Sequence, residues 1–246
     1  MDRAYILHSY PYRETSLILQ AWTEKHGRLG LVAKGARRPK SASRSTLVAF
    51  QPLVLDWFGR AELKTLKTAE PAAPATPLGG QALMSGFYLN ELLLKLTTRD
   101  DPHEGLFRAY DEAIGALRAV SRQERAASAL EPTLRRFELR LLQELGYAVE
   151  LTRESPGGAA IAAEREYWYV VERGPVQVPE GAPAPANAVR LRGRTLVDLE
   201  HGRLEDAATI VEAKRLMRVL INHSLNGQEL ATRAMVRDLQ RFEDDL

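Results

Sequence analysis

The chain has 246 residues, and its 34 Lys and Arg residues against 32 Asp and Glu residues give a net charge of +2. It contains no cysteine, which excludes disulfides, thiolate nucleophiles and cysteine-ligated metal centres, and fits a reducing compartment. The first residues lack the apolar block of a signal peptide, and polar residues interrupt the most apolar segment, 83–96, before it reaches membrane-spanning length, so we expect a cytoplasmic protein that binds no membrane.

The first part of the chain shows short runs of alternating apolar and polar residues, the pattern of half-buried strands. Gly27 and Gly59 stand in two of the turns, where glycine accepts positive φ without strain. Five short strands within about 80 residues cannot hide their edges as a flat sheet, so we expect closure into a small barrel of the OB or SH3-like kind. The expected strands are 4–8, 17–23, 29–34, 53–58 and 63–68.

A basic loop follows the third expected strand. Residues 1–80 hold 12 basic and 6 acidic residues, and no carboxylate occurs between Glu24 and Asp56. A charge run is usually a solvated surface, but a local excess of this kind attracts a polyanion. We therefore predict a phosphate-binding loop, with Lys64 and Lys67 of the last strand adding charge. Its expected phosphate contacts are Lys34, Arg37, Arg38, Lys40 and Arg44.

The aromatic residues of these strands allow two interpretations. A small barrel binds single strands with a cationic groove and aromatic platforms on which bases stack. Trp22, Trp57 and Phe58 lie in expected strands, where half of the side chains fill the barrel. For each of the three, core packing is favoured over base stacking.

A proline- and alanine-rich segment, 69–80, reads as a domain boundary. It predicts a barrel domain over 1–80 and a mainly helical domain over 81–246. Apolar residues at helical spacing predict helices that start near Pro102 and Pro132, the second ending at Gly146, and two more over 204–225 and 232–242. For residues 155–187 the sequence predicts an irregular hairpin with a mobile connection.

No catalytic pattern is visible. The five histidines are scattered, without the spacing that places two metal ligands on one helix face. Neither of the glycine-rich phosphate cradles, GxGxxG and GxxxxGK[ST], occurs. We therefore expect no enzyme activity, no metal, no cofactor and no small-molecule substrate.

Several stretches resemble, in order and spacing, the bacterial recombination mediator family RecO. They are AYILHSYPYRETSLILQAWTEKHGRLGLVAKGARRPKS, FQPLVLDWFGRAELKTLKTAE, YLNELLLKL and LRRFELRLLQELGY, and the likeness continues to the end of the chain. The resemblance implies an α+β protein of two domains: an amino-terminal OB-fold and a helical domain with a small zinc-finger-like insertion, at about 150–188 here.

The resemblance also implies a function in DNA repair and homologous recombination. A member of this family binds single- and double-stranded DNA and anneals complementary strands without ATP. Together with RecR it helps RecA to replace single-stranded-DNA-binding protein (SSB). The resemblance further implies that the protein associates with the nucleoid.

This chain departs from the family at the insertion. Many members carry C-x-x-C after the LGY sequence, whereas Glu154 and Gly157 stand at those positions here. Without cysteine a thiolate zinc site is ruled out, so other contacts must hold the insertion, or it is loose.

A second implied partner is the acidic, apolar carboxyl-terminal tail of SSB, which requires an apolar pocket with a cation at its rim. On a helix, Arg135 shares a face with Leu139 and Leu142, while Arg136 and Arg140 point more towards water. The alternative is that Arg135 only pairs with Glu131, one turn earlier. Because of the resemblance to the family, we prefer the tail-binding site to simple pairing with Glu131.

Two other classes of function remain as alternatives. A generic RNA-binding OB protein would share the barrel and the basic loop, and competition between RNA and single-stranded DNA separates it from a mediator. A metal-dependent nuclease would cleave DNA during a long incubation with divalent metal, whereas a mediator leaves the strands intact.

Overall fold

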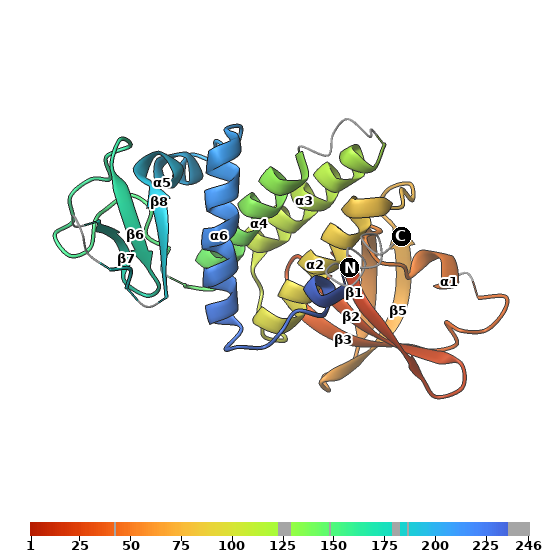
Figure 1. Cartoon of the computed structure of the whole chain (residues 1–246). Helices are drawn as coiled ribbons and strands as arrows, with labels where there is room; N and C mark the ends of the chain where they lie inside the picture. The colour runs from red at the N-terminus through yellow and green to blue at the C-terminus, as the bar shows by residue number, and fades with distance from the viewer. Residues whose placement is uncertain (42, 123–128, 148, 179–182, 186, 236–246) are drawn as a thin grey trace. The chain divides into compact units, whose positions relative to one another are not determined.

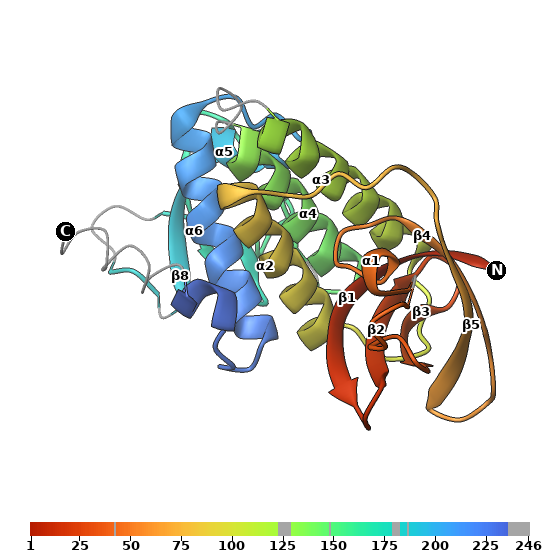
Figure 2. The ribbon, with the colours of Figure 1, turned by 90° about the vertical axis from the view of Figure 1, so that its right-hand side faces the viewer.

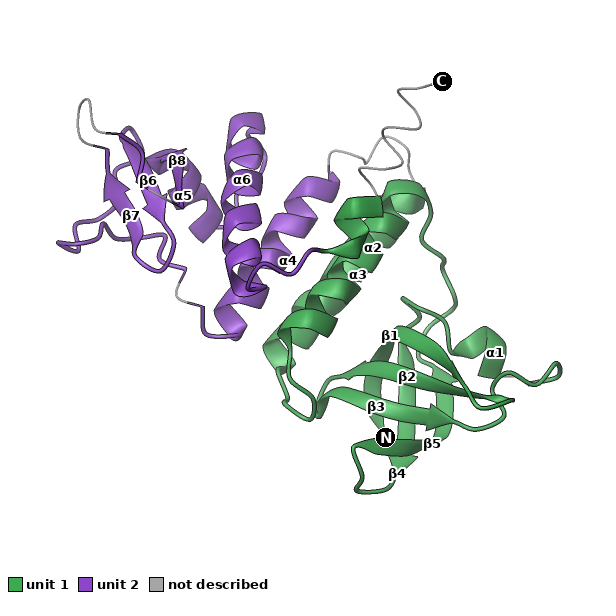
Figure 3. Cartoon of the chain, turned by 60° about the horizontal axis from the view of Figure 1, so that its bottom comes forward, with its two compact units in different colours: residues 1–127, 230–246 green, residues 128–229 purple. Residues whose placement is uncertain are grey.

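The computed structural model describes the chain except for residues 42, 123–128, 148, 179–182, 186 and 236–246. The chain forms two compact units, which Figure 3 colours separately. The first contains residues 1–127 and 230–246, and the second contains residues 128–229. The boundary predicted at residue 80 separates the barrel from the first long helix inside the first unit.

The first unit begins with a closed five-stranded barrel in the order β1-β2-β3-β5-β4. Figure 1 labels β1, β2, β3 and β5 of this barrel. β3 and β5 pair in parallel and the other neighbours are antiparallel. Because β1 pairs with both β2 and β4, no long edge stays open. The expected OB-like barrel is confirmed. Its elements are β1 (Asp2–Tyr12), β2 (Ser16–Thr23), β3 (Gly27–Ala33), α1 (Ser43–Thr46), β4 (Leu53–Phe58) and β5 (Leu63–Pro71).

Alternate apolar side chains of the strands fill the barrel. Leu19, Leu31 and Leu53 are fully buried there, as the period-two pattern predicts. β1 is longer than the strand that we expected over 4–8. A register shift between Ile6 and His8 interrupts the alternation, so the period-two pattern did not indicate the residues that follow it.

Gly27 makes a close approach that its residue type allows. Its φ is +67°, and a Cβ atom there would overlap the backbone carbonyl of Asp101. The turn between β2 and β3 can therefore pack against the segment before the second long helix only with glycine at this position.

Two helices of the first unit, α2 (Gly80–Leu96) and α3 (Glu104–Arg122), lie side by side (Figure 2). α3 begins two residues after the predicted Pro102. Asn90 links both helices to the barrel: its Nδ2 donates to the Leu7 carbonyl at 2.9 Å, and its Oδ1 accepts from the Tyr110 hydroxyl at 2.6 Å. Burial raises the pKa of the Tyr110 phenol, which keeps it a donor.

The carboxyl-terminal segment returns to α2. The Glu91 carboxylate accepts hydrogen bonds from the backbone N–H groups of Ala231 and Thr232 at 2.8 and 2.9 Å. Residues 231–235 are helical, which agrees with the start of the helix predicted over 232–242. The remainder of that prediction lies outside the described residues.

The described residues of the second unit form three helices and a three-stranded antiparallel sheet in the order β7-β6-β8. Gly146, with φ of +78°, follows the end of α4 as predicted. The helix predicted from residue 204 starts at Ala207, because the Asp206 side chain accepts the Thr209 N–H at 2.8 Å and caps it. The elements are α4 (Leu130–Glu144), β6 (Glu166–Val170), β7 (Gly174–Gln177), β8 (Ala188–Arg192), α5 (Gly193–Glu200) and α6 (Ala207–Ser224).

The insertion is more regular than predicted. β6 and β7 form the expected hairpin, and β8 adds a third strand that the sequence pattern did not indicate. Tyr167 and Tyr169 of β6 are buried. The mobile connection predicted before residue 188 lies partly outside the described residues.

No helix in the described part of the chain is long and apolar enough to cross a membrane.

Candidate nucleic-acid interface

The basic loop after β3 is anchored at both ends. Ala36 and Leu47 are buried in the barrel core, at 1% and 6% exposure. The Arg37 N–H donates to the Thr15 carbonyl at 2.8 Å, which fastens the loop to the turn between β1 and β2. Gly35, with φ of +68°, turns the chain at the start of the loop.

The predicted loop cations all point to solvent. Among the described residues no carboxylate lies within 4.0 Å of any of their charged groups. Arg37 Nη1 makes only long contacts of 3.4 Å to the carbonyls of Arg13 and Glu14. One anchored loop therefore presents five unneutralised positive charges, a surface suited to a polyanion. The five exposed cations are Lys34, Arg37, Arg38, Lys40 and Arg44.

Lys64 and Lys67 differ from the loop cations because each has a carboxylate partner. Lys64 Nζ lies 2.6 Å from Asp100, and Lys67 Nζ lies 2.9 Å from Asp56. The hydrogen bond from Lys67 lowers the pKa of the Asp56 carboxyl below its ordinary value. These ion pairs reduce the net charge that β5 presents.

Core packing was predicted for three aromatic residues, and the structure bears this out for two of them. Trp22 is fully buried and Trp57 packs against the barrel core, so core packing is confirmed for both. For Phe58 it is wrong, because this side chain is 58% exposed. Phe58 follows a register shift between Asp56 and Trp57 and is the last residue of β4, so it faces outward.

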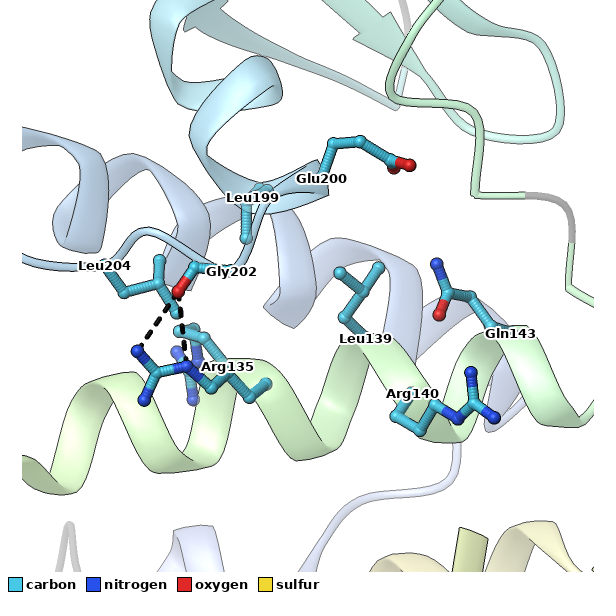
Figure 4. A pocket seen from close by; sticks show the side chains of 9 residues that line it. Arg135, Leu139, Arg140, Gln143, Leu199, Glu200, Gly202 and Leu204 are labelled. Atoms are coloured by element: carbon cyan, nitrogen blue, oxygen red, sulfur yellow. Dashed lines mark hydrogen bonds between the residues drawn. The ribbon is translucent and has the colours of Figure 1, made fainter. Parts of the chain in front are cut away.

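The predicted tail-binding residues lie on or near a shallow cavity of the second unit (Figure 4). The cavity measures about 170 Å³, and Leu139 of α4 lies across from Leu199 and Leu204 (Figure 4). Arg135 and Leu139 line this cavity, whereas Leu142 is fully buried and does not. The structure thus brings two of the three predicted residues to one cavity.

Arg135 is not an exposed rim cation. It is 5% exposed, and its guanidinium contacts the buried Glu138 carboxylate through Nε and Nη2, each at 2.7 Å. Only the Nη2 contact has the geometry of a hydrogen bond. The predicted partner Glu131 lies farther away, at 3.6 Å from Nη1. The charge of Arg135 is therefore balanced inside the protein.

The exposed cations at the cavity are Arg136 and Arg140, as the helical spacing predicts. Arg136 donates to the Gly202 carbonyl at 3.1 and 3.3 Å, and Arg140 pairs with Glu144 at 2.5 Å. Both stay exposed, so an acidic ligand in the cavity would meet them rather than Arg135.

The residues at the positions of the family's C-x-x-C do not fit a zinc site. The Glu154 carboxylate accepts a hydrogen bond from the Tyr167 hydroxyl at 3.0 Å, and Gly157 has no ligating side chain. Tyr167 also accepts from the Ala162 N–H at 3.0 Å. Through these two hydrogen bonds, Tyr167 joins two parts of the insertion.

The chain matches two family models. One, described as Recombination protein O N terminal, matches residues 1–75, and the other, Recombination protein O C terminal, matches residues 79–234. The two matches are separated at the proline-rich segment after the barrel.

Curated relatives are similar over nearly their whole length. The DNA repair protein RecO of Azoarcus sp. (strain BH72) is 48% identical over 236 residues, which cover 96% of this chain and 94% of the relative. The protein of the same name from Nitrosospira multiformis is 46% identical over 239 residues, covering 97% and 95%. That from Laribacter hongkongensis is 41% identical over 246 residues, covering 99% and 96%.

Proposed function

The chain belongs to the recombination protein O family of DNA repair proteins, and we propose that it acts as an ATP-independent mediator of homologous recombination at the nucleoid. In this role it binds single- and double-stranded DNA, anneals complementary strands and, with RecR, helps RecA to replace SSB on single strands.

The five unpaired cations of the anchored loop carry this proposal. Two complementary strands repel each other through their phosphates, so pairing is slow until that charge is screened. A loop whose cations have no carboxylate partners among the described residues can neutralise phosphates without first breaking ion pairs. Annealing then needs no chemical step, because pairing itself is favourable once the strands meet.

The experiment that tests the proposal is strand annealing. Complementary oligonucleotides coated with SSB are mixed with and without this protein, in the absence of ATP, and duplex formation is followed over time. We expect faster pairing with intact strands. Equal pairing rates with and without the protein, with or without RecR, would contradict the mediator role, and divalent-metal-dependent cleavage would indicate a nuclease.

We further propose that the cavity beside α4 binds the acidic, apolar tail of SSB. Leu139, Leu199 and Leu204 would contact the apolar end of the tail, with Arg135 in the wall beside them. Arg136 and Arg140 would contact its carboxylates, because they are the cations exposed at the rim.

Replacing Arg136 and Arg140 together with alanine is expected to weaken binding of an SSB tail peptide at least tenfold, since a hydrogen bond to a charged group contributes roughly 1.5–3 kcal/mol. Fluorescence anisotropy of a labelled peptide measures this. The matched control replaces Arg215 and Arg218, exposed cations of α6 that do not line the cavity. Equal losses in both double variants would show general electrostatics and contradict the site.

A further inference from the structure

One transverse row of side chains crosses all five strands of the barrel. The register pairs Tyr10 with Ile18, Ile18 with Val32, Val32 with Thr65, and Thr65 with Phe58. Paired residues of neighbouring strands point to the same face of a sheet. With strands about 4.8 Å apart, the row spans roughly 20 Å along the barrel surface.

The row lies on the outer face. Tyr10 is 47% exposed and Phe58 is 58% exposed, at its two ends, and the three residues between them are partly exposed. The residues that alternate with them on β2 and β3, such as Leu19 and Leu31, are fully buried in the core. Four of the five row residues are apolar or aromatic, which is unusual for the solvent face of a barrel.

Further aromatic and apolar groups extend the row. The His8 ring lies 4.3 Å from the Tyr10 ring. Leu63, which is 38% exposed, pairs with Gly30 in the neighbouring register row. This surface (the outer row, Tyr10, Ile18, Val32, Thr65 and Phe58, with His8 and Leu63 beside it) contains no carboxylate.

Positive charge borders the outer row on the side of the basic loop. Lys34 follows Val32 by two residues and is exposed. Arg13, at the tip of the β1–β2 hairpin, places its guanidinium over the Tyr12 ring at 5.1 Å from the centroid. A ligand that fits both features has a negatively charged backbone and flat apolar groups at regular spacing, which is the chemistry of a single-stranded nucleic acid.

The position of the outer row agrees with this ligand. It runs between the β1–β2 hairpin, which carries Tyr10, and the β4–β5 hairpin, which carries Phe58. Barrels with this strand order bind oligonucleotides across the face between these two hairpins. The bases of a duplex are stacked on one another, so only an unpaired strand offers them to Tyr10 and Phe58.

We propose that the outer row is a base-stacking platform, with Tyr10 and Phe58 as its principal contacts, which gives the barrel a preference for single-stranded over double-stranded DNA. This inference rests on the proposed DNA-binding function. The basic loop holds the phosphates of either form of DNA, and the row adds affinity only for unpaired bases.

The test compares Tyr10→Ala and Phe58→Ala with the wild-type chain in titrations of a single-stranded oligonucleotide and of its duplex. Each variant is expected to lose about tenfold in single-strand affinity, the usual effect of removing one stacked base contact. Duplex affinity and the salt dependence of binding stay unchanged, because no cation is removed. Tyr10→Phe and Phe58→Tyr retain the rings and are expected to keep wild-type affinity.

Val48→Ala is the matched control, because Val48 is an exposed apolar residue, at 41%, of the segment between α1 and β4, outside the row. Single-strand affinity within twofold of wild type in both alanine variants would overturn the platform. So would equal losses for the duplex and the single strand. Failure of the proposed function looks different, because the wild-type chain would then bind neither form of DNA in dilute buffer.

Discussion

Replacing Arg37, Arg38 and Lys40 with alanine is expected to weaken binding to single-stranded DNA by on the order of 100-fold in dilute buffer. The three side chains are exposed, and none has a carboxylate within 4.0 Å among the described residues. Their replacement removes charge from the loop without removing an ion pair. Fold stability should change little, because exposed positions rarely contribute more than about 0.5 kcal/mol.

The salt dependence of DNA binding tests the phosphate contacts of the loop more directly than the affinity does. Each phosphate contact on a single strand contributes about 0.7 to the slope of log affinity against log salt concentration, because it releases a condensed counterion. Loss of three contacts should therefore reduce the slope by about 2. Titrations of a labelled oligonucleotide at several salt concentrations measure both quantities.

A control of equal charge separates the loop from the overall field. Lys25, Lys95 and Arg108 are exposed cations of the same unit that lie outside the loop. Their triple replacement by alanine changes the net charge equally and is expected to leave the slope within about 0.5 of wild type. A wild-type slope in the loop variant, or the same reduction in both, would show that the loop does not hold the phosphates.

The sequence predicted the strands from alternating apolar and polar residues, and in β3 and β4 the buried side chains do recur with period two. Leu29 and Leu31 of β3, and Leu53 and Leu55 of β4, alternate with less buried or smaller residues, whereas every residue of β2 from 19 to 23 is buried. The far half of β1 was missed because it extends past a register shift and leaves the core, so no alternation marks it. The pairing of β3 with β5 is long-range and leaves no local pattern in either strand.

The parts of the candidate site that depend on local charge could be predicted from the sequence. The parts that depend on which side chains are buried could not. The loop cations follow directly from a stretch without carboxylates. The environment of Arg135 does not, because helical spacing places both Glu131 and Glu138 within its reach, and only packing against the rest of the unit decides which pair is buried. The outer row likewise needs the register of five strands, which single-strand patterns cannot give.

The buried pair of Arg135 and Glu138 gives the second large expected effect. Glu138 is 1% exposed and Arg135 is 5% exposed, with two contacts of 2.7 Å between them. Glu138→Ala leaves a buried guanidinium with Glu131 as its nearest carboxylate, at 3.6 Å. Removing one partner of a buried ion pair typically costs about 3–5 kcal/mol, because the remaining charge is poorly solvated.

Guanidinium chloride unfolding, followed by far-ultraviolet circular dichroism, measures this loss. The control is Arg140→Ala, which removes an exposed pair with Glu144 on the same helix and should cost less than about 1 kcal/mol. DNA binding at low temperature should stay at the wild-type level in Glu138→Ala, because the basic loop belongs to the other unit.

Replacing both members of the pair decides whether the effect comes from charge or from packing. In Arg135→Leu/Glu138→Leu no charge is left behind, so the double variant should be more stable than Glu138→Ala by about 2 kcal/mol or more. A double variant that loses the full sum of Arg135→Leu and Glu138→Leu, each measured alone, would show that the side chains act through shape alone. In that case Arg135 would stabilise the unit by packing, and its positive charge would contribute nothing to the free energy of unfolding.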